Sequence, residues 1–413
     1  MNDSVLKIAL QCPQCGAPLE LRETEHMVRC SFCRVRHVIS ALPCPCFYVH
    51  PRLQGEMIYV PYWRFKGTSF VLDQGKVSFK IVDETRVARK EDFPFSLGLK
   101  VQTQMLSFVQ PDTPGTFLQP HIPLREAVAT MGSGGHRIGH PEARGTVQTQ
   151  VGEVTSLVYA PLCMEGHRIW DAISGKELPM GTALWTAVQG EGTRVPYPDF
   201  WPALCPTCGW DLIGDKDSLV QFCSGCGQAW TAGERGLVQT RVSFAAGPGK
   251  GPYLFLPFWH LEIAIPKLET HTMADFSRLF RRGRGIYPHG GPDRDGPAAS
   301  FIPAFKIRPR IFLRLARQMS MATQLKEVAS APGLRENFPV TIGQSEAFEA
   351  LIPVLGHLIR HQKTMESLCS QNGLKLRSPR LMYIPFLHQG MDYVHPELNI
   401  AIPERALFFS QWL

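Results

Sequence analysis

Short apolar runs separated by polar turns dominate this chain of 413 residues. Two of the most apolar runs, 57–67 (MIYVPYWRFKG) and 253–263 (YLFLPFWHLEI), are rich in aromatic and aliphatic residues. Runs of this length and composition predict strands. The proline within each predicts an edge position or a bulge, because proline cannot donate to a strand ladder. We expect the aromatic residues of both runs to pack in a core rather than to stack on a ligand.

These two runs belong to a longer set of landmarks that recurs along the chain. Segment 114–127 parallels 332–347, and segment 156–171 parallels 380–395, in the same order in both halves. The last landmark of each half is a strand pattern that contains Tyr-x-Pro. A tandem duplication with insertions in the second half is the simplest explanation of this order.

A helical pattern occupies 345–373. Apolar residues recur there with i, i+3, i+4, i+7 spacing, Ser345 is the expected N-cap, and Gly373 is the expected C′ residue. Pro353 interrupts the pattern, so either the helix kinks there or a turn precedes a helix that starts with Pro353 at N1. A shorter helical counterpart is expected around 124–131 in the first half.

Eight of the twelve cysteines occur as Cys-x-x-Cys pairs, in two sets of two pairs. Within each set the pairs are separated by fourteen residues, and the second set lies 193 residues after the first. Thiolates at this spacing reach a tetrahedral zinc ion from one tight turn, while a proline sets the entry and a glycine admits the left-handed residue that follows. The expected ligands are Cys12, Cys15, Cys30, Cys33, Cys205, Cys208, Cys223 and Cys226.

Both cysteine segments, each 22 residues long, resemble the zinc-ribbon family, which implies two zinc-clasped β-hairpins. Four cysteines fill the zinc tetrahedron, whereas a catalytic zinc needs an open position, so we expect two structural Zn²⁺ ions. Arg34 stands where a ribbon often has glycine, a departure that leaves the ligand set intact. His26 and His37 lie nearby as alternative ligands, although surface or strand histidines are the simpler interpretation.

Composition supports a folded chain rich in strands. Hydrophobic residues make up 44% and charged residues 19%, as in globular proteins, and 36 glycines with 34 prolines favour turns over long helices. We therefore predict a β-rich α+β fold formed by tandem duplication, in which each half is a four-cysteine zinc ribbon followed by an antiparallel β module with a few helices. The expected domains are ribbon 1 (1–42), β-rich module 1 (43–195), ribbon 2 (196–236) and β-rich module 2 with a basic insertion loop and a helix (237–413).

The first residues and the cysteine usage bear on the compartment. The start of the sequence, MNDSVLKIALQC, has an acidic residue in place of a basic region and only a short apolar run, so we expect no signal peptide. No run reaches about 18 uninterrupted apolar residues, so we expect no membrane span. Zinc-bound cysteines in a reducing cytosol are then favoured over disulfides, and we expect a cytoplasmic protein.

Positive charge is concentrated in one segment, 278–317. The formal net charge of the chain is +7, and two four-thiolate zinc sites, each of net charge −2, lower it to about +3. If Pro309 opens a helix, the three arginines that follow fall on one face, where they could hold phosphates. The alternative is a solvated loop, or contact with an acidic surface on a partner. The expected polyanion-binding residues are Arg281, Arg282, Arg284, Arg310, Arg314 and Arg317.

The cysteines outside the two sets suggest a different chemistry. Cys44 and Cys46 form a Cys-x-Cys signal flanked by prolines, and Cys163 has His167 close in sequence. A cysteine–histidine pair can supply a nucleophile, so these residues define the hypothesis of a thiol-dependent enzyme. The simpler interpretation of Cys163 is a buried cysteine that packs as a small apolar residue.

The preferred functional prediction is a non-catalytic zinc-binding scaffold or adaptor that presents β surfaces to protein partners. Hairpins of this size cannot stabilise themselves by burial, so a chain that keeps two of them is expected to use their exposed faces. One alternative is a nucleic-acid-binding zinc-ribbon protein that uses segment 278–317. The other alternative is a thiol-dependent enzyme, although we expect that the protein is not an enzyme.

Overall fold

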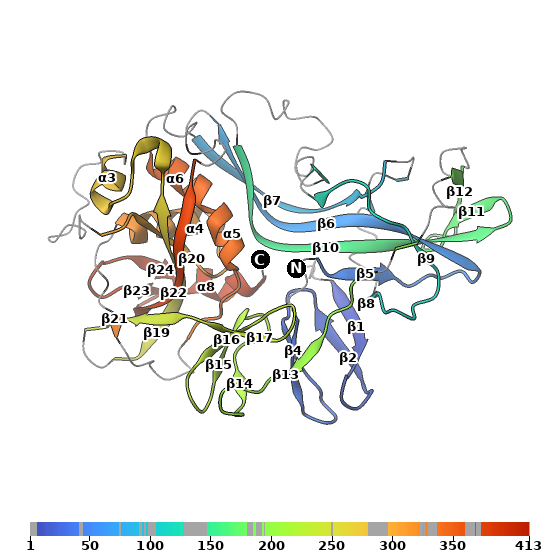
Figure 1. Ribbon diagram of the computed structural model, residues 1–413, viewed down its shortest axis with the longest axis horizontal. Helices are drawn as coiled ribbons and strands as arrows, with labels where there is room; N and C mark the ends of the chain where they lie inside the picture. The colour runs from blue at the N-terminus through green and yellow to red at the C-terminus, as the bar shows by residue number, and fades with distance from the viewer. Residues whose placement is uncertain are drawn as a thin grey trace.

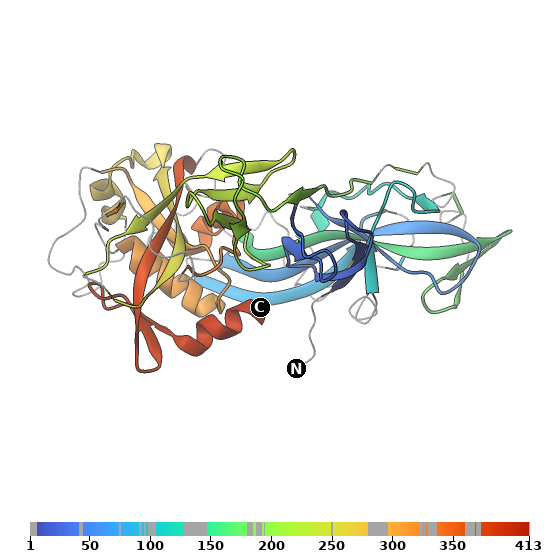
Figure 2. The ribbon, with the colours of Figure 1, turned by 90° about the horizontal axis from the view of Figure 1, so that it is seen from below.

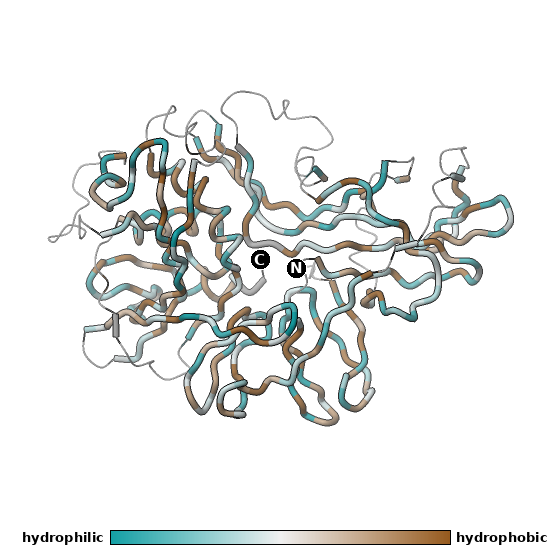
Figure 3. The backbone as a smooth tube through the Cα atoms, viewed as in Figure 1, coloured by the Kyte–Doolittle hydropathy of each residue, from teal (hydrophilic) through white to brown (hydrophobic). Residues whose placement is uncertain are grey.

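The computed structural model consists of two strand-rich halves that lie side by side, with the cysteine hairpins together along one edge (Figure 1). Strands account for 47% and helices for 16% of the described residues. Apolar stretches occur in both halves (Figure 3). The described residues are 6–40, 44–73, 76–90, 93–94, 96–97, 105–124, 126–127, 147–179, 185–186, 192–193, 195–248, 251–279, 296–321, 325, 327–328, 337–359, 368 and 373–412.

The first half is built, in its described part, on a ten-stranded sheet around two long paired strands. Strand β6 (Glu56–Asp73) runs antiparallel to β10 (Val147–Glu165), and β7 (Lys76–Val87) pairs with the other side of β6. The other strands of this sheet are β1 (Lys7–Gln11), β2 (Pro18–Arg22), β5 (Cys46–Val49), β8 (Met105–Phe108), β9 (Thr116–Phe117), β11 (Arg168–Asp171) and β12 (Glu177–Leu178).

The second half is built, over its described residues, on a seven-stranded sheet that carries helices. Strand β19 (Tyr253–Ala264) lies between β22 (Lys375–Gln389) and β20 (Ala299–Pro303), antiparallel to both. The other strands are β18 (Val242–Ala245), β21 (Glu327–Val328), β23 (Asp392–Val394) and β24 (Ala401–Pro403). The helices are η2 (Pro266–Leu268), α3 (Met273–Arg278), α4 (Pro309–Met321), α5 (Gln344–Glu349), α6 (Leu351–Leu358), α8 (Glu404–Phe408) and η4 (Phe409–Trp412).

Most strand pairs in both sheets are antiparallel, as predicted, but each sheet also contains parallel pairs that were not expected. Strand β5 runs parallel to β10, and β18 runs parallel to β22. Strand β1 is also parallel to β8, and β6 to β9. Parallel neighbours are joined by long connections rather than tight hairpins, so no local turn signal in the sequence marks them.

The helices of the second half begin and end differently from the prediction. The N-cap of α5 is Gly343, and Ser345 lies inside the helix, because the Glu346 carboxylate accepts the Gly343 N–H at 2.7 Å. The single predicted helix is two helices, α5 and α6, separated at Ala350. Pro353 is the third residue of α6. The first four N–H groups of a helix have no partner within it, so a proline there removes no helical hydrogen bond. Pro309 does open a helix, α4, which is the condition on which the expected arginine face depends. Among the described residues, no helix is both long and apolar enough to cross a membrane.

The two Pro-aromatic-Trp runs form strands whose prolines occupy equivalent positions. Pro61 on β6 pairs with Tyr159, and Pro257 on β19 pairs with Tyr383. The opposite edge of each strand pairs with another strand only from the residue after the proline. On β6 this pairing with β7 begins at Tyr62, and on β19 the pairing with β20 begins at Phe258. The missing N–H is therefore not required by the ladder, which confirms the expected local edge position.

The tryptophans of these runs hold each strand to the segment before a helix. Trp63 donates its indole N–H to the carbonyl of Ile122 at 2.7 Å, and Trp259 donates to the carbonyl of Ile342 at 2.9 Å. Trp259 is buried, as are the aromatic residues that precede the two tryptophans. The prediction that these aromatics belong to the core is confirmed. Burial favours an acceptor for an indole N–H, and these two bonds join each strand to its segment.

A turn after the closing strands is held by a side-chain acceptor in each half. The Asp171 carboxylate accepts the N–H of Ile173 at 2.9 Å. His395 Nδ1 accepts the N–H groups of Glu397 and Leu398 at 3.2 and 3.1 Å. A ring nitrogen that accepts cannot carry a proton, so His395 is neutral, and burial lowers its pKa to about 4.

Stability is expected to fall in acid because of His395. The unfolded chain binds a proton on this residue below a pH of about 6.5, whereas the folded chain does so only below about 4. The stabilisation is therefore complete above pH 6.5 and is lost as the pH falls to 4, a change of about 3 kcal/mol in the free energy of unfolding. Urea unfolding at pH 7 and pH 4.5 measures it.

The control is His395→Asn, whose side-chain oxygen can accept the same two backbone bonds without titrating. Acid also protonates the zinc thiolates of both proteins, so only the difference between the variant and the wild type reports on His395. We expect a shallower pH dependence in the variant. Identical pH dependence in the two proteins would contradict the assignment.

The two halves share a core because the long strands of the first half reach into the second. Phe70 and Leu72, near the end of β6, belong to the same buried apolar cluster as Leu355 of α6. Helix α6 passes so close that a Cβ on Gly356 would lie 2.7 Å from Leu72. Figure 2 shows β6, β7 and β10 extending from one half into the other. The halves therefore form one interlocked body.

Candidate metal centres

The first cysteine group lies at the ends of two hairpins, β1–β2 and the hairpin that follows it. Strand β2 precedes β3 (Met27–Arg29), which pairs antiparallel with β4 (Arg36–Ile39). The sulfur of Cys12 lies 3.7 Å from that of Cys33, and the sulfur of Cys15 lies 3.7 Å from that of Cys30. We call this ligand group clasp 1 and the segment 12–39 ribbon 1.

The second cysteine group has the same arrangement. Strands β14 (Leu212–Ile213), β15 (Val220–Cys223), β16 (Ala229–Ala232) and β17 (Leu237–Thr240) form an antiparallel sheet. The sulfur of Cys205 lies 3.7 Å from that of Cys226, and the sulfur of Cys208 lies 3.3 Å from that of Cys223. We call this group clasp 2 and the segment 205–240 ribbon 2.

Both groups fit a tetrahedral metal ion. The four sulfur atoms of each group lie within 4.8 Å of one another. Four ligands at the zinc–sulfur distance of about 2.3 Å stand about 3.8 Å apart, close to the distances in each clasp. An ion held by four thiolates has no open position, so it supplies folding energy rather than a reactive water. His26 and His37 belong to neither group of ligand atoms.

Backbone hydrogen bonds shape the knuckles of both clasps. Gly16 donates to the carbonyl of Cys12 and Gly209 to that of Cys205, each at 2.9 Å. Phe32 also donates its N–H to the sulfur of Cys30 at 3.4 Å. The backbone amides of Cys33 and Phe32 favour the thiolate and lower the pKa of Cys30 to about 6 against the opposing effect of burial. Within the same clasp, burial and the neighbouring thiols raise the pKa of Cys33 to about 12, so the knuckle amides favour the thiolate at Cys30 but not at every ligand.

The two ribbons pack against each other although 193 residues separate them in the sequence. Strand β13 (Phe200–Pro202), which leads into ribbon 2, pairs with β4 of ribbon 1. Arg36 forms an ion pair with Asp211 at 2.9 Å, and the N–H groups of His26 and Met27 donate to the carbonyl of Lys216. A common apolar core contains Met27, Val38, Ala203, Cys205, Leu212, Cys223 and Trp230. The ribbons therefore form one body.

Each clasp exposes one large aromatic side chain. Phe32 is 69% exposed and Trp210 is 65% exposed. Phe32 lies in the second knuckle of clasp 1, whereas Trp210 follows the first knuckle of clasp 2. At the position in ribbon 2 that matches Phe32 stands Gly225, and a Cβ there would lie 2.8 Å from the Trp210 ring. Ala17 matches Trp210 in the same way. Each clasp therefore has one exposed aromatic residue, which belongs to the second knuckle in clasp 1 and to the first knuckle in clasp 2.

Ribbon 1 is joined to the body of the first half by a buried ion pair. Arg64 of β6 donates to the Glu23 carboxylate at 2.5 Å and to the Asp83 carboxylate at 2.9 Å. The same Glu23 carboxylate accepts the N–H of Leu6 at 3.2 Å. The side chains of Arg64 and Glu23 are 1% and 0% exposed. Burial raises the pKa of Glu23, and the neighbouring guanidinium opposes this shift.

The predicted polyanion site is only partly described by the structure. Arg281, Arg282 and Arg284 lie outside the described residues. On α4, Arg310 is exposed, but Arg314 and Arg317 are half-buried. Arg314 donates to the carbonyl of Ala401 at 2.9 Å, so it holds α4 to β24. The three helical arginines do not form one free basic face.

The cysteines outside the clasps that the structure describes are engaged with the backbone. The thiol of Cys163 donates to the carbonyl of Gln54 at 3.6 Å, and burial raises its pKa. The thiol of Cys46 donates to the carbonyl of Cys44 at 3.5 Å, and the neighbouring Cys44 thiol, followed by burial, raises its pKa. His167 lies against Trp185, with 5.0 Å between the ring centroids. These contacts favour neutral thiols over nucleophilic thiolates.

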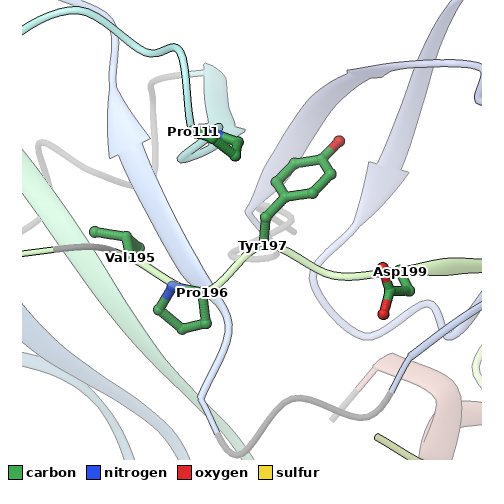
Figure 4. Close-up of a pocket in the computed structure, with 5 residues that line it drawn as sticks. All are labelled: Pro111, Val195, Pro196, Tyr197 and Asp199. Atoms are coloured by element: carbon green, nitrogen blue, oxygen red, sulfur yellow. The ribbon is translucent and has the colours of Figure 1, made fainter. Parts of the chain in front are cut away.

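A shallow pocket lies beside the segment that leads into ribbon 2. Figure 4 shows Pro111, Val195, Pro196, Tyr197 and Asp199 around it. Its polar groups are a phenol and a carboxylate, and Asp199 also donates its backbone N–H to Ser40 at 2.9 Å. The pocket therefore belongs to the junction between β13 and ribbon 1 and lies apart from both clasps.

Comparison with known proteins adds no relative. No protein-family model, no curated protein and no solved structure matches the chain.

Sequence reasoning found all eight clasp cysteines and missed the residues around them. The pairing of the ribbons and the contact of Glu23 with Arg64 join segments that are distant in sequence, so no short motif reveals them. The exposed aromatics carry a weak signal, since Phe32 stands inside a knuckle and Trp210 directly after one.

Proposed function

We propose that both clasps hold structural zinc in zinc ribbons and that the two halves arose by tandem duplication. The sulfur–sulfur distances support the first statement. The second is supported by hydrogen bonds that recur at matching positions: Ala88 donates to the carbonyl of Pro61, and Ala304 donates to that of Pro257, each at 2.9 Å. The two tryptophan–isoleucine bonds form a second matching pair. Such bonds between distant segments rarely arise twice by chance.

The proposed function is that of a non-catalytic cytoplasmic scaffold, which presents the paired ribbons to a protein partner. The exposed aromatic at each clasp carries this proposal. Phe32 and Trp210 lie on the part of each ribbon that four ligands hold rigid, and rigid aromatic side chains lose little entropy on binding. The strands of the two ribbons lie side by side along one edge of the molecule (Figure 1), and β13 pairs with β4, so one partner can contact both ribbons.

The charge of the clasps favours a protein over a nucleic acid. Four thiolates around Zn²⁺ leave a net charge of −2 at each clasp. Arg29 and Arg34, both exposed, offset this charge at clasp 1. At clasp 2, Asp211 adds a further negative charge, which Arg36 neutralises. The face that carries the aromatics is thus not basic, and an apolar contact with a rim of charge suits a protein surface.

Two alternatives have weaker support. A nucleic-acid-binding role would depend on segment 278–317, in which Arg314 is already used within the fold. A thiol-dependent enzyme would need a thiolate at Cys163 or Cys46, whose pKa values are raised. Each stays a prediction.

Photo-crosslinking tests the scaffold proposal. A photoreactive phenylalanine analogue placed at Phe32 or at Trp210 should capture the same protein in cells. Ile81 is the matched control, because it is 62% exposed but lies on β7, outside both ribbons. We expect an adduct from positions 32 and 210 and none from position 81. An adduct from all three positions, or from none, would contradict the proposal.

A further inference from the structure

The two clasps agree at their first knuckles but differ at one residue of the second. Gly16 and Gly209 close the first knuckles with φ of 72° and 76°. Gly227 closes the second knuckle of ribbon 2 with φ of 72°, whereas the matching residue of ribbon 1 is Arg34, with φ of 63°. This left-handed conformation is free of strain for glycine and costly for a residue that has a Cβ.

Ribbon 1 also lacks two supports that ribbon 2 has. Gly227 donates its N–H to the carbonyl of Cys223 at 3.0 Å, and among the described residues Arg34 makes no such bond to Cys30. Cys223 lies in the apolar core shared by the ribbons, whereas Cys30 lies in none of the apolar cores of the described chain. Each clasp has buried and accessible cysteines, so exposure does not rank them.

From these differences we infer that clasp 1 is the weaker metal site and empties first when zinc is scarce. Emptying it affects the rest of the molecule through Glu23, which lies between the two knuckles of ribbon 1. A zinc hairpin loses its fold with its metal, and Glu23 then no longer holds Arg64 or the N–H of Leu6. Ribbon 1 is thus a zinc-responsive switch on β6. This inference depends on zinc in the clasps and is independent of the partner.

Zinc removal with EDTA, followed by cysteine alkylation and mass spectrometry, tests the order of release in the full-length protein. In the wild type, the cysteines of clasp 1 should be alkylated about fivefold to thirtyfold faster than those of clasp 2, as the strain of one left-handed residue implies. Arg34→Gly should reduce this ratio, and Gly227→Arg should accelerate clasp 2. Equal rates in the wild type, or no effect of Arg34→Gly, would overturn the inference.

Amide hydrogen exchange tests the transmission to β6. The N–H of Leu6 is bonded to Glu23, so its exchange should accelerate when the wild type loses its first zinc ion. The control is the double variant Arg34→Gly with Gly227→Arg, in which clasp 2 should empty first. There the first zinc loss disturbs ribbon 1 only through the core that the ribbons share, so the exchange of Leu6 should accelerate much less than in the wild type. Unchanged exchange in the wild type after clasp 1 empties would overturn the proposed switch.

Discussion

Replacing Cys223 by serine should reduce the zinc content from two ions to one per chain and open the body that the ribbons share. Cys223 is fully buried and lies in the common core with Trp230 and Met27. Zinc contributes about 10–16 kcal/mol to the folding of isolated zinc hairpins at neutral pH, far more than burial in so small a hairpin. Elemental analysis measures the zinc, and tryptophan fluorescence reports the exposure of Trp230.

The matched control for this variant is Cys163→Ser, which removes a buried thiol that belongs to neither clasp. It should retain two zinc ions per chain and native fluorescence. Because the core contains residues of both ribbons, Cys223→Ser should also make the cysteines of clasp 1 easier to alkylate. A variant that lacks Cys223 and still binds two zinc ions would refute the assignment of clasp 2.

Glu23→Ala should lower the free energy of unfolding by about 3–5 kcal/mol, because it leaves a buried guanidinium without one of its carboxylates. Arg64 keeps Asp83, whose side chain is 21% exposed, but the N–H of Leu6 loses its acceptor. Urea unfolding at constant zinc concentration measures the change. A loss below about 1 kcal/mol would show that the pair is not needed to hold ribbon 1.

The control is an exposed ion pair between Lys7 of β1 and Glu20 of ribbon 1. Their charged atoms lie 3.2 Å apart, and the side chains are 60% and 50% exposed. Solvent screens such a pair, so Glu20→Ala should cost less than about 1 kcal/mol. Replacing Glu23 and Arg64 together by Leu and Met should restore part of the loss of Glu23→Ala, since no unpaired charge then remains between them.

The metal ligands could be predicted because the cysteines of each knuckle are close together in the sequence. Two residues between paired cysteines and a glycine after the second are enough to define a knuckle. The strands at 57–67 and 253–263 could also be predicted. Their aromatic and aliphatic residues must be buried whichever other strands pair with them. These features depend on neighbours in the sequence.

What could not be predicted depends on segments that meet only in the folded chain. The expectation of Ser345 as an N-cap failed because Glu346 completes a cap with Gly343. Strands β5 and β10 are parallel and are not joined by a tight turn, so no turn motif in the sequence predicts their pairing. Glu23 contacts Arg64 because ribbon 1 packs against β6 in the folded chain. No sequence motif predicts this packing.

The strands that cross from the first half into the second constrain how the chain is made. The apolar end of β6, with Phe70 and Leu72, is complete early in synthesis, but the helix that covers it contains Gly356. About 280 residues separate the two, so at ribosomal rates the strand end waits roughly 15–60 s for its cover. A nascent chain therefore exposes this apolar strand end, paired with β7 but without its helix cover, until α6 has been made. The interlocked halves give stability to the finished protein and create a period in which chaperones have a binding site.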